Sequence, residues 1–184
     1  MPRIQSPHLN ARALLDTIAR AEIGPAMLAD SDDGYNVLVG SLPGDMTLFD
    51  SYADHPLPSD DDAIEYADGV YSTAAGRYQI LNTYWPHYRA QLGLPDFSPE
   101  SQDRYALQQL REQGALPLIH DGYFRRAIAA AASIWASLPG AGYGQHEHAH
   151  ETLVQAYVEA GGQLSSEDHD WYASVIKHSS GGAA

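Results

Sequence analysis

The sequence predicts an α+β domain, mainly helical with one small β-hairpin, and three observations support this fold class. Apolar residues recur at helical spacing in segments spread over the 184 residues. Residues 35–49 differ, because two short apolar runs are joined there by turn-forming residues, as in a hairpin. The chain contains no internal repeat and no linker, and its length suffices for one domain with a sizeable core. We therefore expect residues 1–184 to form a single domain.

The order of the expected elements follows from these patterns. Leu14, Leu15 and Ile18 predict a first helix over about residues 11–23, which ends at Gly24 and Pro25. In the hairpin, residues 35–40 and 46–49 are the strands and residues 41–45 the turn, and residues 50–70 are mostly loop. A short helix is expected over residues 74–81, and Asn82 or Thr83 is expected to cap a second one that has Pro86 in its first turn. Asp121 is expected to cap a helix that runs through residues 127–136. Three further helices are expected over residues 98–114, 146–159 and 165–177.

Composition excludes several classes of function. The chain has no cysteine, which excludes disulfides, thiolate catalysis and cysteine-type zinc sites. A net charge of -14 argues against nucleic-acid binding. No apolar run reaches the length of a membrane helix, and residues 1–8 lack the apolar core of a signal peptide. We therefore expect no membrane insertion, and export by a route other than a signal peptide.

Two glycine-rich segments, residues 72–79 and 136–145, have the composition of a sugar-binding surface. Each places glycines beside a tyrosine and ends on a glutamine. Glycine lets a polymer approach the backbone, tyrosine offers an apolar face, and glutamine offers hydrogen-bonding groups to hydroxyls. The alternative is a pair of turns that happen to contain aromatic residues.

Glu22 is the first candidate for acid catalysis, since it lies at the C-terminal end of the first helix. The negative end of the helix dipole favours a protonated carboxyl group there, and an acid of this kind can protonate a glycosidic oxygen. The alternative is an ordinary surface glutamate. A glycosidase with two carboxylates needs a second acid, for which Asp50, Asp54 and Glu65 are candidates, whereas the neutral Asn36 favours a single-carboxylate mechanism.

Residues 146–150 match the zinc-protease pattern, with His146 and His150 as possible ligands and Glu147 as a possible base. The motif would lie on the first turn of a helix, where a rigid zinc site is not expected, so the alternative is a solvated histidine tract. We expect no metal and no other cofactor.

Several segments together resemble the phage endolysins of the lambda lysozyme type, which are lytic transglycosylases with a lysozyme-like fold. The resemblance covers about residues 11–162 and leaves the helix at 165–177 and a short tail outside. It implies that Glu22 is the catalytic acid. Two departures from the family pattern are Ile23, where glycine is usual, and Asn36, where aspartate is frequent. The segments that support the resemblance are 34–40, 52–56, 72–79, 91–99 and 134–145.

The resemblance also implies the rest of the expected site and its chemistry. It implies a glycan cleft lined by Ser72, Tyr78, Gln79, Tyr143 and Gln145, and we add Tyr35 and Asn36 as substrate-binding residues. The expected partner is the peptidoglycan glycan strand, cleaved between N-acetylmuramic acid and N-acetylglucosamine with a 1,6-anhydro product. A monomer is expected, made in the host cytoplasm and released to the periplasmic wall through a holin. The alternatives are a hydrolysing muramidase, a zinc wall peptidase and a non-catalytic wall-binding module.

Overall fold

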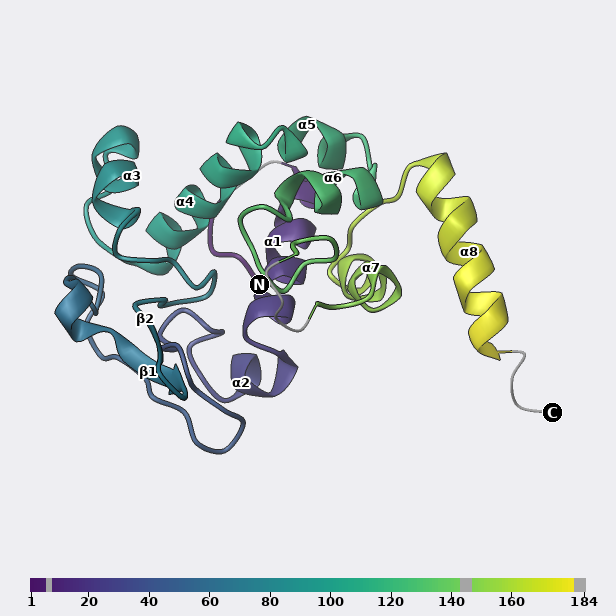
Figure 1. Ribbon diagram of the computed structural model, residues 1–184. Helices are drawn as coiled ribbons and strands as arrows, with labels where there is room; N and C mark the ends of the chain where they lie inside the picture. The colour runs from purple at the N-terminus through teal and green to yellow at the C-terminus, as the bar shows by residue number, and fades with distance from the viewer. Residues whose placement is uncertain (6–7, 143–146, 181–184) are drawn as a thin grey trace. The chain divides into compact units, whose positions relative to one another are not determined.

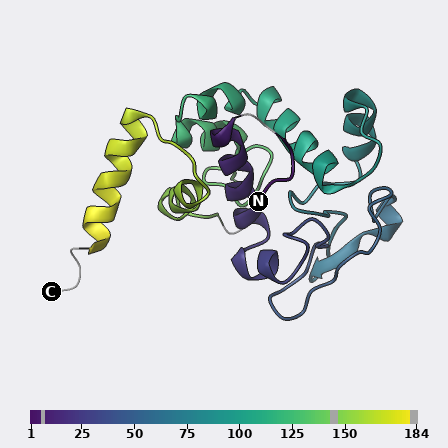
Figure 2. The same cartoon turned by 180° about the vertical axis from the view of Figure 1, so that it is seen from behind.

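The computed structural model describes residues 1–5, 8–142 and 147–180. It forms two compact units, one from Met1–Ile4 and Glu22–Ala106 and the other from Gln5–Ala21 and Leu107–Ala184. Figures 1 and 2 show the elements from opposite sides. In the described residues these are α1 (Leu9–Glu22), α2 (Pro25–Ala29), a 3-10 helix (Asp60–Asp62), β1 (Ile64–Ala67), β2 (Val70–Ser72), α3 (Trp85–Leu92), α4 (Pro99–Glu112), α5 (Ala115–His120), α6 (Phe124–Ala131), α7 (His150–Glu159) and α8 (Ser166–Ser180).

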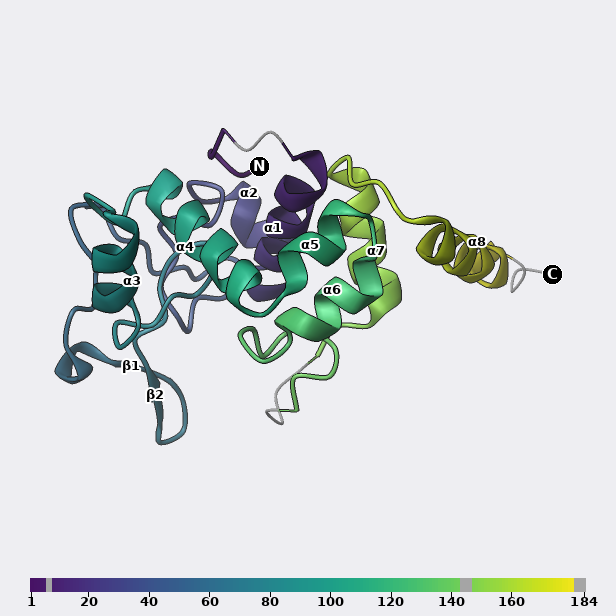
Figure 3. The ribbon, with the colours of Figure 1, turned by 90° about the horizontal axis from the view of Figure 1, so that it is seen from above.

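The unit that contains most of α1 is helical. Leu14, Leu15 and Ile18 are fully buried, which confirms the first helix and the face that it packs. Figure 3 shows α5, α6 and α7 gathered around this helix. The side-chain amide of Asn10 donates to the carbonyl oxygen of Ile119 at 3.0 Å, so a polar contact joins α1 to α5 within the apolar packing.

Helix α8 is joined to the same unit by charge pairing with α6. Asp168 is 1% exposed, and its carboxylate accepts a hydrogen bond from Arg125 Nε at 2.5 Å. The guanidinium of Arg125 also lies 4.9 Å from the ring centroid of Trp171 on α8. A buried carboxylate needs such a partner, because its desolvation is otherwise uncompensated. The expected C-terminal helix is thus confirmed.

In the other unit, the hairpin does not lie where the sequence predicts it. The two-stranded antiparallel sheet pairs β1 with β2 over residues 64–72, so that it begins within the stretch 50–70 that was expected to be mostly loop. The predicted strand pair at 35–49 forms isolated antiparallel bridges, Val37 with Leu48 and Leu42 with Asp45, and no continuous strands. The Leu38 amide donates to the Thr47 carbonyl and the Phe49 amide to the Asn36 carbonyl, each at 3.0 Å. The α+β class with a small hairpin is confirmed, and the position of that hairpin is corrected.

The predicted helix at 74–81 is also wrong. Ala75 and Ile80 form an antiparallel bridge across a tight turn, in which Gly76 and Gln79 adopt positive φ angles of 76° and 47°. Alanines give this segment a helical composition, but a residue with positive φ interrupts a right-handed helix. Tertiary contacts, described below, hold the turn.

The remaining predicted helices are present, but their bounds differ: α6 ends at Ala131 and not at residue 136, and α4 ends at Glu112 and not at residue 114. Helix α4 has the predicted start at Pro99, and α3 has Pro86 in its first turn as expected. Asp121 does not cap α6, whose N-cap residue is Tyr123 with no side-chain cap, and the short α5 before it was not expected. Helix α7 begins at His150, later than predicted. The described helices are too short or too polar to span a bilayer.

The core of the sheet-containing unit is aromatic and includes a histidine. Phe97 lies edge-on to Trp85, with ring centroids 4.8 Å apart, and edge-on to His55 at 4.9 Å. His55 is 4% exposed; its Nε2 lies 2.9 Å from the Ile80 carbonyl oxygen, and the Leu57 amide donates to its Nδ1 at 3.2 Å. The Nε2–H tautomer of neutral histidine satisfies both contacts. Burial lowers the pKa of His55 below its ordinary value of 6.5.

This environment predicts loss of stability in mild acid. Because the folded pKa of His55 lies below the unfolded one, the unfolded chain binds the proton first, and stability falls as the pH drops through 6.5. The slope from one such group is at most about 1.4 kcal/mol per pH unit. Urea unfolding of the wild type and of His55→Gln between pH 7.5 and 5 should show a shallower slope in the variant. The matched control is the exposed His87→Gln; an equal change of slope in that variant would remove His55 as the cause.

Candidate active site

Glu22 is the last residue of α1, as predicted, and its side chain is partly buried. The chain turns immediately after it. Ile23 is 3% exposed, and Gly24 adopts a φ of 83° before Pro25 begins α2. Glycine is suited to this left-handed conformation.

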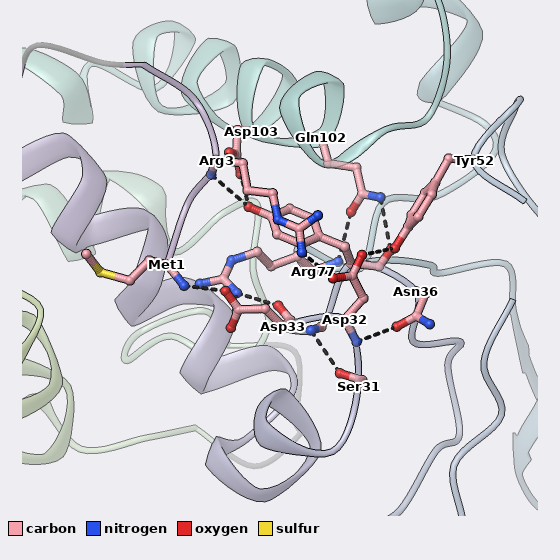
Figure 4. Close-up of polar contacts among 12 residues, drawn as sticks. Met1, Arg3, Ser31, Asp32, Asp33, Asn36, Tyr52, Arg77, Gln102 and Asp103 are labelled. Carbon is pink, nitrogen blue, oxygen red and sulfur yellow. Dashed lines mark hydrogen bonds and ion pairs between the residues drawn. The ribbon is translucent and has the colours of Figure 1, made fainter. Parts of the chain in front are cut away.

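The loop after α2 is held by its own polar side chains (Figure 4). The Ser31 hydroxyl accepts from the Gly34 amide at 2.9 Å, and Asn36 Oδ1 accepts from the Asp32 amide at 3.0 Å. Asp33 has a φ of 52°, a conformation that costs energy for a residue other than glycine. This loop places Asn36 with its amide oxygen already engaged in the backbone, so the NH₂ group is the part with donors to offer.

Arg77 and Asp33 join this loop to the glycine-rich segment. Arg77 is 1% exposed, and its Nη1 lies 2.8 Å from Asp33 Oδ1 (Figure 4). Its guanidinium also lies 5.1 Å from the ring centroid of Tyr35. A Cβ built on Gly34 would lie 3.4 Å from Ile23 Cγ1 and 3.6 Å from Arg77 Cα. The residue that follows Glu22, the loop and the glycine-rich segment therefore meet at Gly34.

Asp103 of α4 is bonded to two of the three tyrosines that were predicted to bind the glycan, Tyr35 and Tyr78. Its Oδ1 accepts from Tyr35 at 2.8 Å and from Tyr78 at 2.6 Å, and its Oδ2 accepts from the Ile4 amide at 2.8 Å. Burial raises the pKa of Asp103, although these hydrogen bonds favour its charged form. Burial also raises the pKa of both tyrosines.

The burial of these tyrosines corrects their expected role. Tyr35 is 0% exposed and Tyr78 is 1% exposed, so neither ring has a face available for stacking on a sugar. The two residues are core side chains whose hydroxyls satisfy Asp103. A tyrosine beside a glycine in the sequence is equally consistent with a binding residue and with a core residue. The burial of the side chain distinguishes the two.

Ser72, Gln79 and Asn36 are the predicted binding residues that stay partly exposed in this unit. The backbone pairs their segments, because the Gly76 amide donates to the Val37 carbonyl at 2.8 Å. Ser72 Oγ accepts from the Ala74 amide at 3.1 Å, and Gln79 Nε2 donates to the Gly76 carbonyl at 3.0 Å. The two other predicted binding residues, Tyr143 and Gln145, lie outside the described residues.

Gln102 was missed by sequence reasoning, yet its amide organises the segment from within. Its Oε1 accepts from the Arg77 amide at 3.0 Å, and its Nε2 donates to the carbonyls of Tyr35 and Phe97 at 3.0 and 2.9 Å. Gln102 and Asp103 are adjacent polar residues on a helix and look like a solvated face. Nothing in the sequence marks either residue as buried. Only the fold places Gln102 against the backbone of Arg77, whose own burial was not predicted.

The three candidates for a second carboxylate are placed differently. Asp50 is exposed. Asp54 accepts from Trp85 Nε1 at 2.7 Å and from Arg89 Nη1 at 2.6 Å, and although burial opposes it, these bonds hold the pKa of Asp54 below its ordinary value. Glu65 accepts from the Gly69 amide at 2.9 Å and from Tyr71 at 3.2 Å. Asp54 borders a pocket of about 390 Å³ on α3, whose lining does not include Glu22.

The zinc-protease arrangement does not form. Its pattern requires both histidines and the glutamate on one helix, but Glu147 precedes α7 and His150 is its first residue. Glu147 instead accepts hydrogen bonds from the amides of Gly140 and Gly142, each at 2.8 Å. His146 lies outside the described residues. Across residues 1–5, 8–142 and 147–180, no group of three or more histidine, aspartate or glutamate side chains could hold a metal ion.

The comparison with solved structures defines the fold as lysozyme-like. The structure of bacteriophage lambda lysozyme complexed with a chitohexasaccharide superposes with a TM-score of 0.77 at 44% identity, covering 88% of this chain and 99% of that one. A second structure of lysozyme from bacteriophage lambda gives a TM-score of 0.73 at 42% identity, with the same coverage of both chains.

The chain belongs to the endolysin family, whose profile it matches over residues 12–164. The endolysin of Escherichia phage P2 is 49% identical over 163 residues, which is 88% of this chain and 98% of that protein. The endolysin of Escherichia phage lambda is 46% identical over 158 residues, which is 85% of this chain and 94% of that protein. The expected resemblance is thus confirmed, and helix α8 begins after the family match ends.

The packing of Gln102 against Gly76 predicts a large cost for Gly76→Ala. The new Cβ would overlap the Gln102 amide, which is buried and cannot move without losing its backbone partners, and the φ of 76° adds strain. The two effects together should lower the free energy of unfolding by about 2–4 kcal/mol, measured by urea titration.

Gly44→Ala is the matched control for this prediction, because Gly44 has a φ of 83° and nothing within 4 Å of its built Cβ. Strain alone should cost that variant about 1–2 kcal/mol. Equal losses in the two variants would show that the Gln102 contact contributes nothing.

Proposed function

We propose that this protein is a peptidoglycan lytic transglycosylase in which Glu22 alone performs the acid and base steps. The observation that supports it most is the placement of a partly buried glutamate at the end of α1 in a chain of the endolysin family. The related lambda lysozyme, whose structure was solved with a chitohexasaccharide, supports a β-1,4-linked amino-sugar strand as the ligand.

In the proposed reaction, Glu22 first protonates the oxygen between C1 of N-acetylmuramic acid and C4 of N-acetylglucosamine. The C1–O bond breaks, and the N-acetylglucosamine end leaves with the proton. The ionised Glu22 then accepts the proton of the muramic C6 hydroxyl as that oxygen bonds to C1. The product is a 1,6-anhydro sugar, no water is consumed, and Glu22 is protonated again.

The intramolecular nucleophile explains why one carboxylate suffices. A hydroxyl held on the same sugar has a large effective concentration, so a second protein carboxylate is not needed to activate water. Asp54 and Glu65 are bonded within the protein, to Trp85 and Arg89 and to Gly69 and Tyr71. Asn36 is neutral. These features favour the transglycosylase over a hydrolysing muramidase.

The glycan contacts that we propose in the described residues are Ser72, Gln79 and Asn36, with Tyr143 and Gln145 added by the resemblance. Tyr35 and Tyr78 support this surface from the core. As a phage endolysin, the protein is proposed to act as a monomer, to accumulate in the host cytoplasm and to reach the wall after a holin opens the membrane.

Glu22→Gln is expected to abolish release of soluble fragments from purified peptidoglycan, by at least about 1,000-fold, because an amide cannot donate the required proton. Thermal unfolding should be close to that of the wild type, since the amide and the carboxylate have the same shape. The control is Glu65→Gln, which should keep activity within about threefold. Substantial activity of Glu22→Gln would overturn the assignment of the acid.

The reaction type is tested separately, by mass spectrometry of the fragments that the wild type releases. We expect anhydro-muramic ends, which are lighter than reducing ends by one water (about 18 Da), both with and without a chelator. Reducing muramic ends would identify a hydrolase, for which Asp50, Asp54 and Glu65 are the candidate second carboxylates. Loss of activity in the chelator would identify a metal-dependent reaction.

A further inference from the structure

The residues Glu147 and His148, which the zinc pattern first singled out, each make a specific contact with another part of their unit. Glu147 Oε2 accepts from the Gly140 amide and Oε1 from the Gly142 amide, each at 2.8 Å. These backbone hydrogen bonds lower the pKa of Glu147, so the carboxylate is charged near neutral pH. Glu147 therefore fixes the backbone of the second glycine-rich segment.

His148 is fixed at its backbone and at its ring. Its amide donates to the Ser137 carbonyl at 2.9 Å, and its Nε2 lies 3.2 Å from the Ala21 carbonyl oxygen. A carbonyl oxygen can only accept, so Nε2 carries the proton and donates. The Ala21 carbonyl lies in the last turn of α1, where carbonyl groups have no partner within the helix.

The contact of His148 with the Ala21 carbonyl matters because this carbonyl directly precedes Glu22 in the chain. The carbonyl of Ala21 and the Cα of Glu22 belong to the same planar peptide unit. A hydrogen bond that fixes the orientation of this carbonyl therefore fixes the plane from which the Glu22 side chain leaves the backbone. Beyond Glu22 the helix continues no further, since Gly24 has a φ of 83°.

We propose that His148 is a positioning residue for Glu22, and that Glu147 and His148 together link the glycine-rich segment to the end of the catalytic helix. This inference rests on the proposed function, in which Glu22 is the acid. In this proposal Glu147 and His148 have different roles. His148 aligns the reacting carboxyl group, whereas Glu147 holds the Gly140–Gly142 backbone against which a glycan is expected to lie.

Steady-state digestion of purified peptidoglycan distinguishes these roles. His148→Leu removes the donor and should lower kcat about 10- to 100-fold, with KM within about twofold, because misalignment affects the chemical step. His148→Gln should restore most of kcat, since its amide nitrogen can occupy the Nε2 position and donate to Ala21. Glu147→Ala should instead raise KM about fivefold or more, with a smaller effect on kcat.

The matched control is His169→Leu, because His169 lies in the same unit with a side chain that is 72% exposed. It should leave both constants unchanged. Should His148→Leu fail to fold, the comparison of His148→Gln with His148→Asn replaces it, because the shorter amide does not reach Ala21. A higher kcat for glutamine than for asparagine supports positioning, and equal values for the two contradict it.

The Glu22 and His148 variants test the proposed function and the positioning role separately. An active Glu22→Gln would remove the function itself, whatever the histidine variants do. An inactive Glu22→Gln combined with wild-type kcat in His148→Leu would leave the function and overturn the positioning role. A second readout is hydrogen exchange of the α1 backbone amides, which His148→Leu should accelerate only in the last turn of the helix; uniform acceleration along α1 would indicate a merely structural role.

Discussion

The sheet-containing unit depends on the hydrogen bonds that the buried carboxylate of Asp103 accepts. A charge in the interior is costly unless hydrogen bonds replace its hydration. Here the hydroxyls of Tyr35 and Tyr78 and the backbone amides of Arg3 and Ile4 supply them. Removing any of these donors leaves part of a buried carboxylate unsatisfied, so the loop at 35, the turn at 78 and the segment at 3–4 are held in place together.

Gln102 extends the same principle to the backbone. It lies next to Asp103 on α4 and bonds to the Arg77 amide and to the carbonyls of Tyr35 and Phe97. Because the amide occupies the space beside Gly76, no side chain fits at that position. The glycine in this motif therefore serves the packing of α4, and the same turn carries the partly exposed Gln79.

The sequence predicted the position of the candidate acid in the fold, because the required signal was local. Glu22 was placed correctly at the end of α1, because apolar spacing defined the helix and Gly24 with Pro25 marked its end. Tyr78, which the resemblance placed in the cleft, and Tyr35, which was added as a binding residue, are both buried. Local sequence reasoning has no access to this burial. Sequence reasoning also could not find Asp103 or Gln102, because a polar pair on an amphipathic helix is normally solvated. These two residues are buried only because distant segments of the chain pack against them.

The sequence by itself determined the endolysin resemblance, the mainly helical α+β class, the extent of α1 and α4, and the candidate acid, because each depends on residue type at short range. The tertiary structure decided the rest. The sheet forms at 64–72 and not at 35–49, residues 74–81 form a turn and not a helix, and Glu147 accepts hydrogen bonds from glycine amides. The physical reason is that hydrogen bonds and burial between distant segments outweigh the small local preferences of a few residues.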